Sequence, residues 1–538
     1  MSIRHLLALV LSFVSAAALE AQPPATRLDA IFARCTSPDS PGCAVAVSTQ
    51  TDTVARGYGL AELEHDVPIL PNTIFESGSV SKQITAAAVV LLALDGKLGF
   101  DDDVRKYVPE LPDYGTQITI RHLLNHTSGL RDWGSVMALA GWPRGSRVYN
   151  NRIVVDIASR QKALNYVPGT HYSYTNTGYN LLAVIVARVS GQTFADFTRD
   201  RIYLPLGMTS SSWRDDYTRI VKGRANAYAP AGTAWRLDMP FENAHGNGGM
   251  LTTVQDLLRF TKNLETGAVG GPRFIEEMHR QARLNSGREI SYASGLFVDE
   301  WRGMKEVQHS GATGGYRAFV SRLPQKDVAV AVLCNASSAN PTALAHQALE
   351  AYLDLPAVTA ARPATTDSAA VARILGTYRN ARVGQPVRLA WRDGRIVLGN
   401  GQPLSPGGER RFVSSGGDEV VFDVLEPGTV RGGFVVFSGG DSTRFDPVTP
   451  FTPTAANAME YAGTYVSDEA EATLTVVADG ANVRLRDRYG SVRQMLPSYR
   501  DSFAAGGTII TFVRDASGKV IGMNVGTDRA WSVRFARN

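Results

Sequence analysis

The feature that most constrains this chain is the stretch Phe75–Gln83, which runs directly into an apolar segment, Ile84–Leu94. A continuous apolar segment of this length predicts a buried helix. Within Gly78-Ser-Val-Ser-Lys82, Ser79 precedes Lys82 by three residues, so both side chains would share one helix face where this helix begins. A lysine that is removed from water can accept the proton of a neighbouring serine. The stretch therefore predicts a serine nucleophile, Ser79, with a lysine base, Lys82.

The same spacing occurs a second time, in Ser159-Arg-Gln-Lys162. This second pair lies in a polar helical stretch, with no glycine before it and no apolar helix after it, which predicts a solvent-exposed helix face. At the first pair, Gly78 permits the close approach of another backbone segment, and the helix that follows can bury Lys82 and lower its pKa. We therefore assign the nucleophile to Ser79 and not to Ser159.

A lysine base works better with a partner that relays the proton and donates it to the leaving group. The loop segment Tyr174-Thr-Asn176 offers a phenol and an amide two residues apart. The same pattern occurs at Tyr149–Asn151, just before a predicted helix, and at Tyr378–Asn380, in a region of repeated strands. From this context we assign the functional pair to Tyr174 and Asn176.

An acyl intermediate also needs a strand edge whose backbone N–H groups help to stabilise an oxyanion. His309-Ser-Gly311, the single H-x-G of the sequence, runs through Ala312 toward a strand predicted from Tyr316. The single K-x-G, Lys97–Gly99, lies at the far end of the nucleophile helix and could not reach the serine. Taken singly, His309 is better explained as a structural histidine, so residues 309–312 are a candidate for this strand that the other motifs have to support.

The order of the predicted elements indicates an α+β domain over residues 22–356. Strands precede and follow a region dominated by helices, which suggests a mainly antiparallel sheet that carries helices. The predicted outer elements are a helix over 26–34, strands over 43–49, 53–60, 316–323 and 328–334, and a helix over 341–353.

Residues 357–370 have the composition of a linker, and the sequence beyond them repeats. Leu375-Gly-Thr-Tyr378 recurs as Ala462-Gly-Thr-Tyr465, and short alternating segments between Gly/Asp turns follow in both copies. This pattern predicts two small antiparallel barrels, over 371–455 and 456–538. Histidine and cysteine are absent from both repeats, so catalysis by these residues and metal binding through them are excluded there. Binding, gating or a structural role remains for the barrels.

The N-terminal residues 1–21 resemble a secretory signal, with Arg4 and His5 before an apolar core. The alternative is an N-terminal membrane anchor, for which the apolar core is short. Because no other stretch is long enough to span a bilayer, we expect a soluble protein that is secreted or periplasmic.

The net charge of +4 over 538 residues, without a long basic run, gives no indication of nucleic-acid binding. The oligomeric state is left open.

The sequence has three cysteines. Cys35 and Cys43 flank a turn-rich loop, so in an oxidising compartment we expect a local disulfide between them, with two free thiols as the alternative. Cys334 lies in an apolar run and is expected to be a buried core thiol. Neither C-x-x-C nor H-E-x-x-H occurs, so we predict no structural zinc, and no metal or cofactor is expected to take part in the chemistry.

Taken together, these motifs resemble the serine β-lactamase and penicillin-binding-protein family, particularly its class C, D-aminopeptidase and esterase branch. The resemblance covers roughly residues 28–355, with S-x-x-K first, Y-x-N second and the K/H-x-G strand last. It rests also on the segments Leu123-Leu-Asn-His-Thr-Ser-Gly-Leu130, Pro168-Gly-Thr-His-Tyr-Ser-Tyr-Thr-Asn-Thr-Gly-Tyr179 and Gly248-Gly-Met-Leu-Thr-Thr-Val-Gln-Asp256. It implies a β-lactamase/transpeptidase-like fold, and the tail resembles the lipocalin-like barrels of D-aminopeptidases.

The resemblance also implies roles for the residues. Those with catalytic roles are Ser79 as the acylated nucleophile, Lys82 as its base, Tyr174 as general acid/base and His309 in the third motif. Those with substrate-binding roles are Asn176, Ser310, Gly311 and Ala312. The oxyanion hole would consist of the backbone N–H groups of Ser79 and Ala312, while His126 and Ser128 would shape a loop.

The departure from the family pattern is His309, where class C β-lactamases carry a lysine. A histidine is mostly neutral near pH 7, so it does not supply the fixed charge that helps to hold a β-lactam carboxylate. We therefore expect an exported serine hydrolase that acts on small esters or D-amino-acid amides and peptides. The alternatives are a β-lactamase or D,D-carboxypeptidase, and a catalytically silent protein that binds cell-wall fragments.

Overall fold

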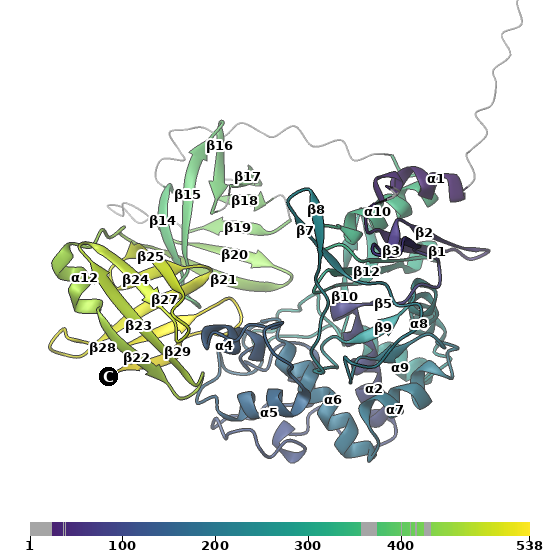
Figure 1. The fold of residues 1–538 in the computed structure, drawn as a ribbon, viewed down its shortest axis with the longest axis horizontal. Coiled ribbons are helices and arrows are strands. Elements are labelled where there is room, and N and C mark those ends of the chain that lie inside the picture. Colours follow the sequence, from purple (N-terminus) through teal and green to yellow (C-terminus); the bar gives the residue numbers. More distant parts are fainter. Residues whose placement is uncertain are drawn as a thin grey trace, which may run out of the picture.

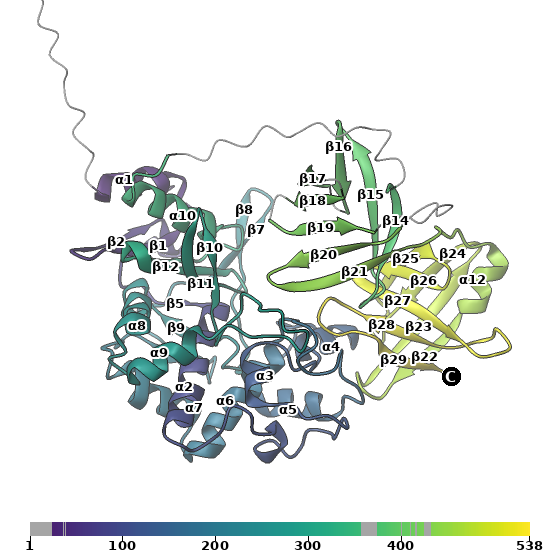
Figure 2. The same ribbon diagram turned by 180° about the vertical axis from the view of Figure 1, so that it is seen from behind.

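The structure, a computed structural model, describes residues 24–35, 37, 39–356, 374–399, 401–408, 410–414, 417–423 and 432–538. The predicted signal segment 1–21 and the predicted linker 357–370 lie outside the described residues. The chain forms an α+β domain and, beside it, two closed antiparallel barrels, which Figures 1 and 2 show from opposite sides. The predicted fold class is confirmed.

A six-stranded antiparallel sheet forms the centre of the first domain, in the order β10-β11-β12-β13-β1-β2. Its strands come from both ends of the domain: β1 (Cys43–Ser48), β2 (Thr53–Tyr58), β10 (Phe297–Trp301), β11 (Met304–Thr313), β12 (Tyr316–Leu323) and β13 (Val328–Cys334). The edge strand β10 pairs only with residues 304–308 of β11. Residues 309–313 of β11 therefore have a strand, β12, on one side only, and their other edge is open to the nucleophile turn.

Alternate residues of β1 face opposite sides of the sheet. Val45 and Val47 belong to a core with helices α1 (Pro24–Ile31) and α10 (Pro341–Tyr352), whereas Ala44 belongs to the core of the larger helical layer. In that second core lies α2 (Lys82–Leu94), whose residues 82–92 are all buried. The predicted apolar helix thus becomes the centre of the domain.

The remaining helices are α3 (Ile120–Leu124), α4 (Trp133–Leu139), α5 (Asn151–Ser159), α6 (Asn176–Ser190), α7 (Phe194–Thr198), α8 (Val254–Thr266) and α9 (Gly271–His279). The 3₁₀ segments are Ala33–Cys35, Gly78–Ser81, Val104–Lys106 and Pro324–Lys326, and Arg199–Tyr203 is a π-helical turn. The domain also contains three small sheets. The first pairs β3 (Leu60–Glu62) with β4 (Val67–Pro68), and the second pairs β7 (Tyr228–Ala231) with β8 (Ala234–Leu237). In the third, β9 (Met250–Thr252) lies between β5 (Phe75–Glu76) and β6 (Ser212–Trp213).

The disulfide differs from the prediction. Cys43 is bonded to Cys334, and the expected Cys35–Cys43 bond is wrong. Cys43 and Cys334 lie directly opposite each other where β1 pairs with β13, with their Cα atoms 4.0 Å apart. The bond therefore joins residues 291 positions apart, because the sheet brings the two ends of the domain together.

The two barrels contain eight strands each. The first consists of β14 (Gly376–Asn380), β15 (Pro386–Arg392), β16 (Arg395–Leu398), β17 (Gln402–Pro406), β18 (Arg411–Ser414), β19 (Glu419–Phe422), β20 (Phe434–Ser438) and β21 (Asp441–Pro447). The second follows helix α12 (Ala455–Tyr461) and consists of β22 (Gly463–Ser467), β23 (Ala472–Asp479), β24 (Asn482–Arg486), β25 (Val492–Tyr499), β26 (Ser502–Ala505), β27 (Thr508–Arg514), β28 (Val520–Gly526) and β29 (Val533–Arg537).

The sequence repeat has a structural counterpart. Tyr378 in β14 and Tyr465 in β22 are both fully buried in their barrel cores. Each phenol donates a hydrogen bond of 2.7 Å to the carbonyl four residues earlier, that of Ile374 or Tyr461. The repeated tyrosine therefore ties the first strand of each barrel to the segment before it.

The second barrel packs against α4 and α5, as both views show (Figures 1 and 2). Arg131, just before α4, forms a buried ion pair with Glu469 of the barrel at 2.5 Å. Trp142, just after α4, packs edge-to-face on Tyr489. The first barrel contacts the domain through Asp441, whose carboxylate accepts a hydrogen bond from the Tyr172 backbone N–H. Both barrels therefore contact the loops that surround the predicted site.

Within the described part of the chain, no single helix has the length and apolar character needed to cross a membrane. One bent pair, α6 with Phe194–Tyr203, meets these two criteria when its helices are taken together.

Candidate active site

Ser79 and Lys82 lie together at the start of α2, as predicted. Gly78–Ser81 forms a 3₁₀ turn that continues into the helix, and the Lys82 amine is 3.1 Å from the Ser79 hydroxyl. The amine also donates to the side-chain oxygen of Asn176 at 3.0 Å and to the backbone carbonyl of Asn247 at 2.6 Å. A neutral amine has two N–H donors and one lone pair. The two oxygen acceptors use both donors, which leaves the lone pair for the serine proton.

The surroundings of Lys82 favour the neutral amine. Complete burial lowers its pKa well below the ordinary value, and the positive charges of Arg144 and Arg529 lower it further, while Asp132 opposes them. The surroundings of the serine–lysine pair therefore shift Lys82 toward the neutral state that a base requires.

The nucleophile turn is packed closely against β11. Gly78 has a φ of +52°, and a Cβ atom at this position would lie 2.6 Å from the backbone nitrogen of Ala312. A Cβ on Gly311 would lie 2.0 Å from the carbonyl oxygen of Ser77 and 3.1 Å from the nitrogen of Ser79. Only glycine fits at both positions. This close approach brings the nucleophile turn with Ser79 against the strand segment with Ala312, the two residues whose amides are expected to form the oxyanion hole.

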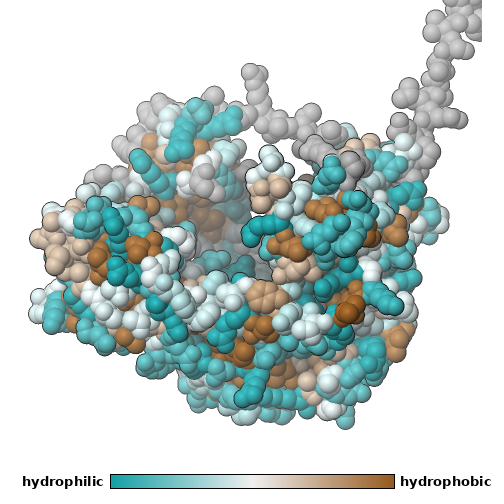
Figure 3. Space-filling view, in the orientation of Figure 1, coloured by the Kyte–Doolittle hydropathy of each residue, from teal (hydrophilic) through white to brown (hydrophobic). Residues whose placement is uncertain are grey.

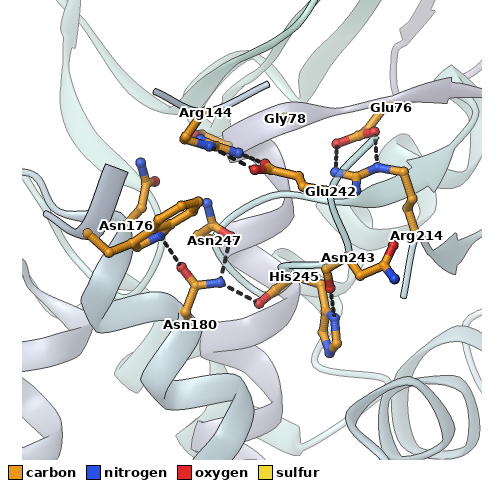
Figure 4. Close-up of polar contacts among 12 residues, drawn as sticks. Glu76, Gly78, Arg144, Asn176, Asn180, Arg214, Glu242, Asn243, His245 and Asn247 are labelled. Atoms are coloured by element: carbon orange, nitrogen blue, oxygen red, sulfur yellow. Dashed lines mark hydrogen bonds and ion pairs between the residues drawn. The ribbon is translucent and has the colours of Figure 1, made fainter. Parts of the chain in front are cut away.

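Buried polar contacts hold the nucleophile turn, Gly78–Ser81, in place. Ser81 donates to the Gly78 carbonyl at 2.6 Å and accepts from the Met250 backbone N–H at 3.1 Å. Glu76, two residues before the turn, accepts a two-pronged hydrogen bond from Arg214 at 2.7 and 2.9 Å, and both side chains are fully buried (Figure 4). Such a fork restricts geometry as well as adding energy.

Tyr174 lies beside the side chains of Lys82 and Arg529. Its ring centroid is 4.7 Å from the Lys82 amine and 5.1 Å from the Arg529 guanidinium carbon, and the centroid of the His126 ring lies 4.2 Å away. The phenol oxygen is buried beside the Ser79 side chain and has no hydrogen bond of ordinary geometry to a described residue. Burial raises the pKa of Tyr174, against the effect of Ser79, so the phenol carries its proton at neutral pH.

Asn176 is held from both ends. It is the first residue of α6, and its backbone N–H donates to Asp132 at 2.7 Å while its side-chain oxygen accepts from Lys82. Asp132 also caps α4 by accepting from the Ser135 N–H at 3.1 Å. The Asp132 carboxylate thus connects the start of α6 with the start of α4. It positions Asn176, which in turn orients Lys82.

The loop that carries Asn247 forms the other support of Lys82. Asn180 donates to the Asn247 side chain at 2.8 Å and to the His245 carbonyl at 2.9 Å, as Figure 4 shows. Asn180 in turn accepts from the Trp133 indole at 3.0 Å. The sequence analysis did not identify Asn247, because its contribution is a backbone carbonyl, for which side-chain patterns give no signal.

His309 lies on β11 and is buried. Its Nδ1 is 2.6 Å from the Ser310 carbonyl, so this nitrogen carries the proton, and its Nε2 accepts from the Tyr292 hydroxyl at 3.1 Å. Burial, with a further contribution from Lys82, lowers the pKa of His309 to about 3. The third motif therefore supplies a neutral ring at neutral pH.

A cavity of about 730 Å³ contains the predicted site. Ser79, Tyr174, Asn176 and residues 309–312 all line it, and Lys82 lies behind Ser79. Figure 3 shows the molecule hollowed between the barrels and the α+β domain. Three arginines that the sequence analysis did not identify also line the cavity: Arg144, Arg317 and Arg529.

The second serine–lysine match does not form a pair. The Ser159 hydroxyl donates to the Asp156 carbonyl at 2.7 Å, and the exposed Lys162 amine donates to Asp468 of the second barrel. Among the described residues, one group has metal-ligand spacing, Glu62, Glu64 and His65 on the surface, and none of the three lines the cavity.

Comparisons with known proteins identify the family of the chain. Residues 25–354 match the family model described as Beta-lactamase. Penicillin-binding protein 4* of Bacillus subtilis is 32% identical over 284 residues, which are 50% of this chain and 62% of that protein. The chain thus spans less than two thirds of that relative. A D-aminopeptidase of Brucella canis is 24% identical over 524 residues, which are 92% of this chain and 96% of the relative.

The fold also has relatives among solved structures. The D-amino acid amidase from Ochrobactrum anthropi SV3, complexed with L-phenylalanine amide, superposes with a TM-score of 0.54 at 22% identity and covers 62% of this chain and 99% of that chain. At this identity the likeness concerns the fold alone. The family match, in contrast, covers more than half of the sequence, and the chain therefore belongs to the beta-lactamase family of serine hydrolases.

Proposed function

We propose that the protein hydrolyses its substrate through an acyl-enzyme on Ser79, with Lys82 and Tyr174 as the acid–base pair. The observation that carries this proposal is the Lys82 amine, 3.1 Å from the Ser79 hydroxyl, with its remaining donors held by Asn176 and Asn247. Ser79 Oγ attacks the substrate carbonyl while its proton passes to the neutral Lys82. The backbone N–H groups of Ser79 and Ala312 receive the developing oxyanion.

The pKa values of Lys82 and Tyr174 shift in opposite directions, which suits one residue to act as the base and the other as the acid. Burial keeps Lys82 neutral and Tyr174 protonated, so the amine accepts a proton and the phenol is able to donate one. Tyr174 then protonates the leaving group, and the resulting tyrosinate takes up the proton held on Lys82, so that both residues regain their starting states while Ser79 stays acylated. In the second half-reaction a water molecule attacks the acyl group with the same residues in reverse roles.

The proposed substrates are small esters or D-amino-acid amides and peptides. Support comes from the relatives named D-aminopeptidase and from the neutral His309, which offers no fixed charge in the third motif. The alternatives are a β-lactamase or D,D-carboxypeptidase, and a silent binding protein. We also propose, from the N-terminal signal pattern, that the protein is exported.

The test is labelling with a neutral fluorophosphonate. We expect wild-type protein to be labelled at Ser79, and Ser79→Ala to lose the label completely. Ser159→Ala is the matched control and should keep wild-type labelling, because the Ser159 hydroxyl donates to the Asp156 carbonyl of its own helix and Ser159 does not line the cavity. Absence of label on the folded wild type would favour the silent binding protein. Turnover of a chromogenic cephalosporin faster than that of simple esters would favour the β-lactamase.

A further inference from the structure

Arg529 brings a positive charge from the second barrel into the active-site cavity. It lies between β28 and β29 and lines the cavity together with Ser79 and Tyr174. Its guanidinium carbon is 5.1 Å from the Tyr174 ring centroid. A residue some 450 positions away in sequence from the nucleophile therefore stands beside the proposed acid.

The backbone around Arg529 is fixed to the catalytic domain. The Arg529 carbonyl accepts hydrogen bonds from the Asp132 N–H at 3.0 Å and from the Asn165 side chain at 3.1 Å. The Trp531 N–H donates to the same Asn165 side chain at 2.8 Å. Because Asp132 also holds the start of α6, the arginine is placed by the same carboxyl residue that orients Asn176.

The cavity carries positive charge without a carboxylate in its wall. The described residues that line it include three arginines and no aspartate or glutamate. Arg144 is engaged in an ion pair with the buried Glu242. Arg317 donates to the carbonyls of Gly314 and Tyr316.

Arg529 differs from both of these arginines. Its carboxylate neighbour is Asp528, with Nε and Oδ2 3.5 Å apart, and that aspartate is 77% exposed. Water screens the charge of a carboxylate that is so exposed. The charge of Arg529 thus remains available to a ligand in the cavity.

We propose that Arg529 binds a carboxylate of the substrate, so that the second barrel selects anionic substrates for Ser79. A guanidinium fork matches a carboxylate in shape and charge, and a partly enclosed cavity strengthens the pair relative to water. The same charge disfavours a free ammonium group at this place, so among the proposed substrates it favours esters and peptides with a carboxylate over D-amino-acid amides. Arg317 adds a second cation, which widens the region that attracts the anion. This inference rests on the proposed function, because it concerns the substrate of the same serine.

The test compares matched esters that differ in charge. The first pair, p-nitrophenyl acetate and mono-p-nitrophenyl succinate, differs in the acyl group. The second, phenyl acetate and 3-carboxyphenyl acetate, differs in the leaving group. For at least one pair, wild-type protein should have the higher kcat/KM for the anionic member. In Arg529→Ala the ratio of anionic to neutral kcat/KM should fall at least about tenfold, and further in Arg529→Glu. A ratio is used because a changed proton transfer affects both members equally.

Arg534→Ala is the matched control. Arg534 is an exposed arginine of the same barrel, on β29, and it does not line the cavity. Its variant should keep the wild-type ratio. The inference is overturned if wild type prefers neither anionic ester, if the Arg529 variants keep the preference, or if Arg534→Ala loses it equally.

A binding measurement separates this inference from the proposed mechanism. Calorimetric titration of Ser79→Ala with phenylacetate and with phenylacetamide needs no catalysis. We expect the carboxylate to bind at least about tenfold more tightly than the amide, and the double variant Ser79→Ala/Arg529→Ala to lose this difference. Equal binding of the two compounds would overturn the inference even if Ser79 is labelled. Failed labelling with preserved carboxylate binding would overturn the mechanism alone.

Discussion

Replacing Gly78 by alanine should separate backbone strain from catalytic geometry. At a φ of +52°, an L-residue costs about 1–2 kcal/mol of folding free energy relative to glycine. In addition, the new Cβ would lie 2.6 Å from the Ala312 nitrogen, whereas carbon contacts are comfortable only from about 3.5 Å. The nucleophile turn and β11 must therefore separate by roughly 1 Å. Displacements of this size at a reacting centre reduce rates on the order of 100-fold.

Gly96→Ala supplies the control. Gly96 follows α2 and has a φ of +68°, and a Cβ atom added there would have no heavy atom within 4 Å, so this variant carries the backbone cost without the overlap. Thermal unfolding and kcat for p-nitrophenyl acetate would be measured for both variants. We expect both to be destabilised and only Gly78→Ala to lose about two orders of magnitude in kcat. The reasoning is refuted if the two variants differ in kcat by less than about threefold while both remain folded.

Two further predictions concern pH and the disulfide. Activity on a neutral ester should fall as the pH is lowered through the depressed pKa of Lys82, because protonation removes the lone pair that accepts the Ser79 proton. On the alkaline side, the activity should not fall until above about pH 10, where Tyr174 with its raised pKa begins to ionise. A kcat/KM profile that declines from about pH 6 to pH 9 would contradict this assignment. Peptide mapping without reduction should find Cys43 linked to Cys334, and replacing both by alanine should lower the free energy of unfolding by about 2–5 kcal/mol, as measured by denaturant titration. Mapping that finds Cys43 joined to Cys35 instead would contradict the strand pairing.

The parts of the site that the sequence predicted depend on local geometry. Ser79 and Lys82 are joined by helical spacing, and Gly78 is required where the turn meets β11. The helix burial that lowers the lysine pKa is itself visible as an apolar run. The rival Ser159 lacks these accompanying features, and its hydroxyl bonds to its own helix. The choice of Ser79 as the nucleophile could therefore be made from local sequence patterns.

The parts that the sequence did not predict depend on pairing between distant segments. Cys35 is near Cys43 in sequence, but the register of β1 and β13 places Cys334 opposite Cys43. The cavity arginines come from a loop, a strand and a barrel, and no motif connects Arg529 to Ser79. The position of Arg529 follows from how the second barrel is docked against the α+β domain. Arginine spacing along the chain carries no information about that docking.

The position of Arg529 raises the question of whether a bound anion would disable the base. A carboxylate on the guanidinium would offset the positive charge that helps to lower the pKa of Lys82. However, burial is the largest cause of that lowering, and Arg144 contributes more than Arg529. An enclosed substrate also excludes water and adds to the desolvation of the amine. Burial and Arg144 therefore still lower the pKa of Lys82 when the anion binds, so selection of the substrate by charge is compatible with a lysine base.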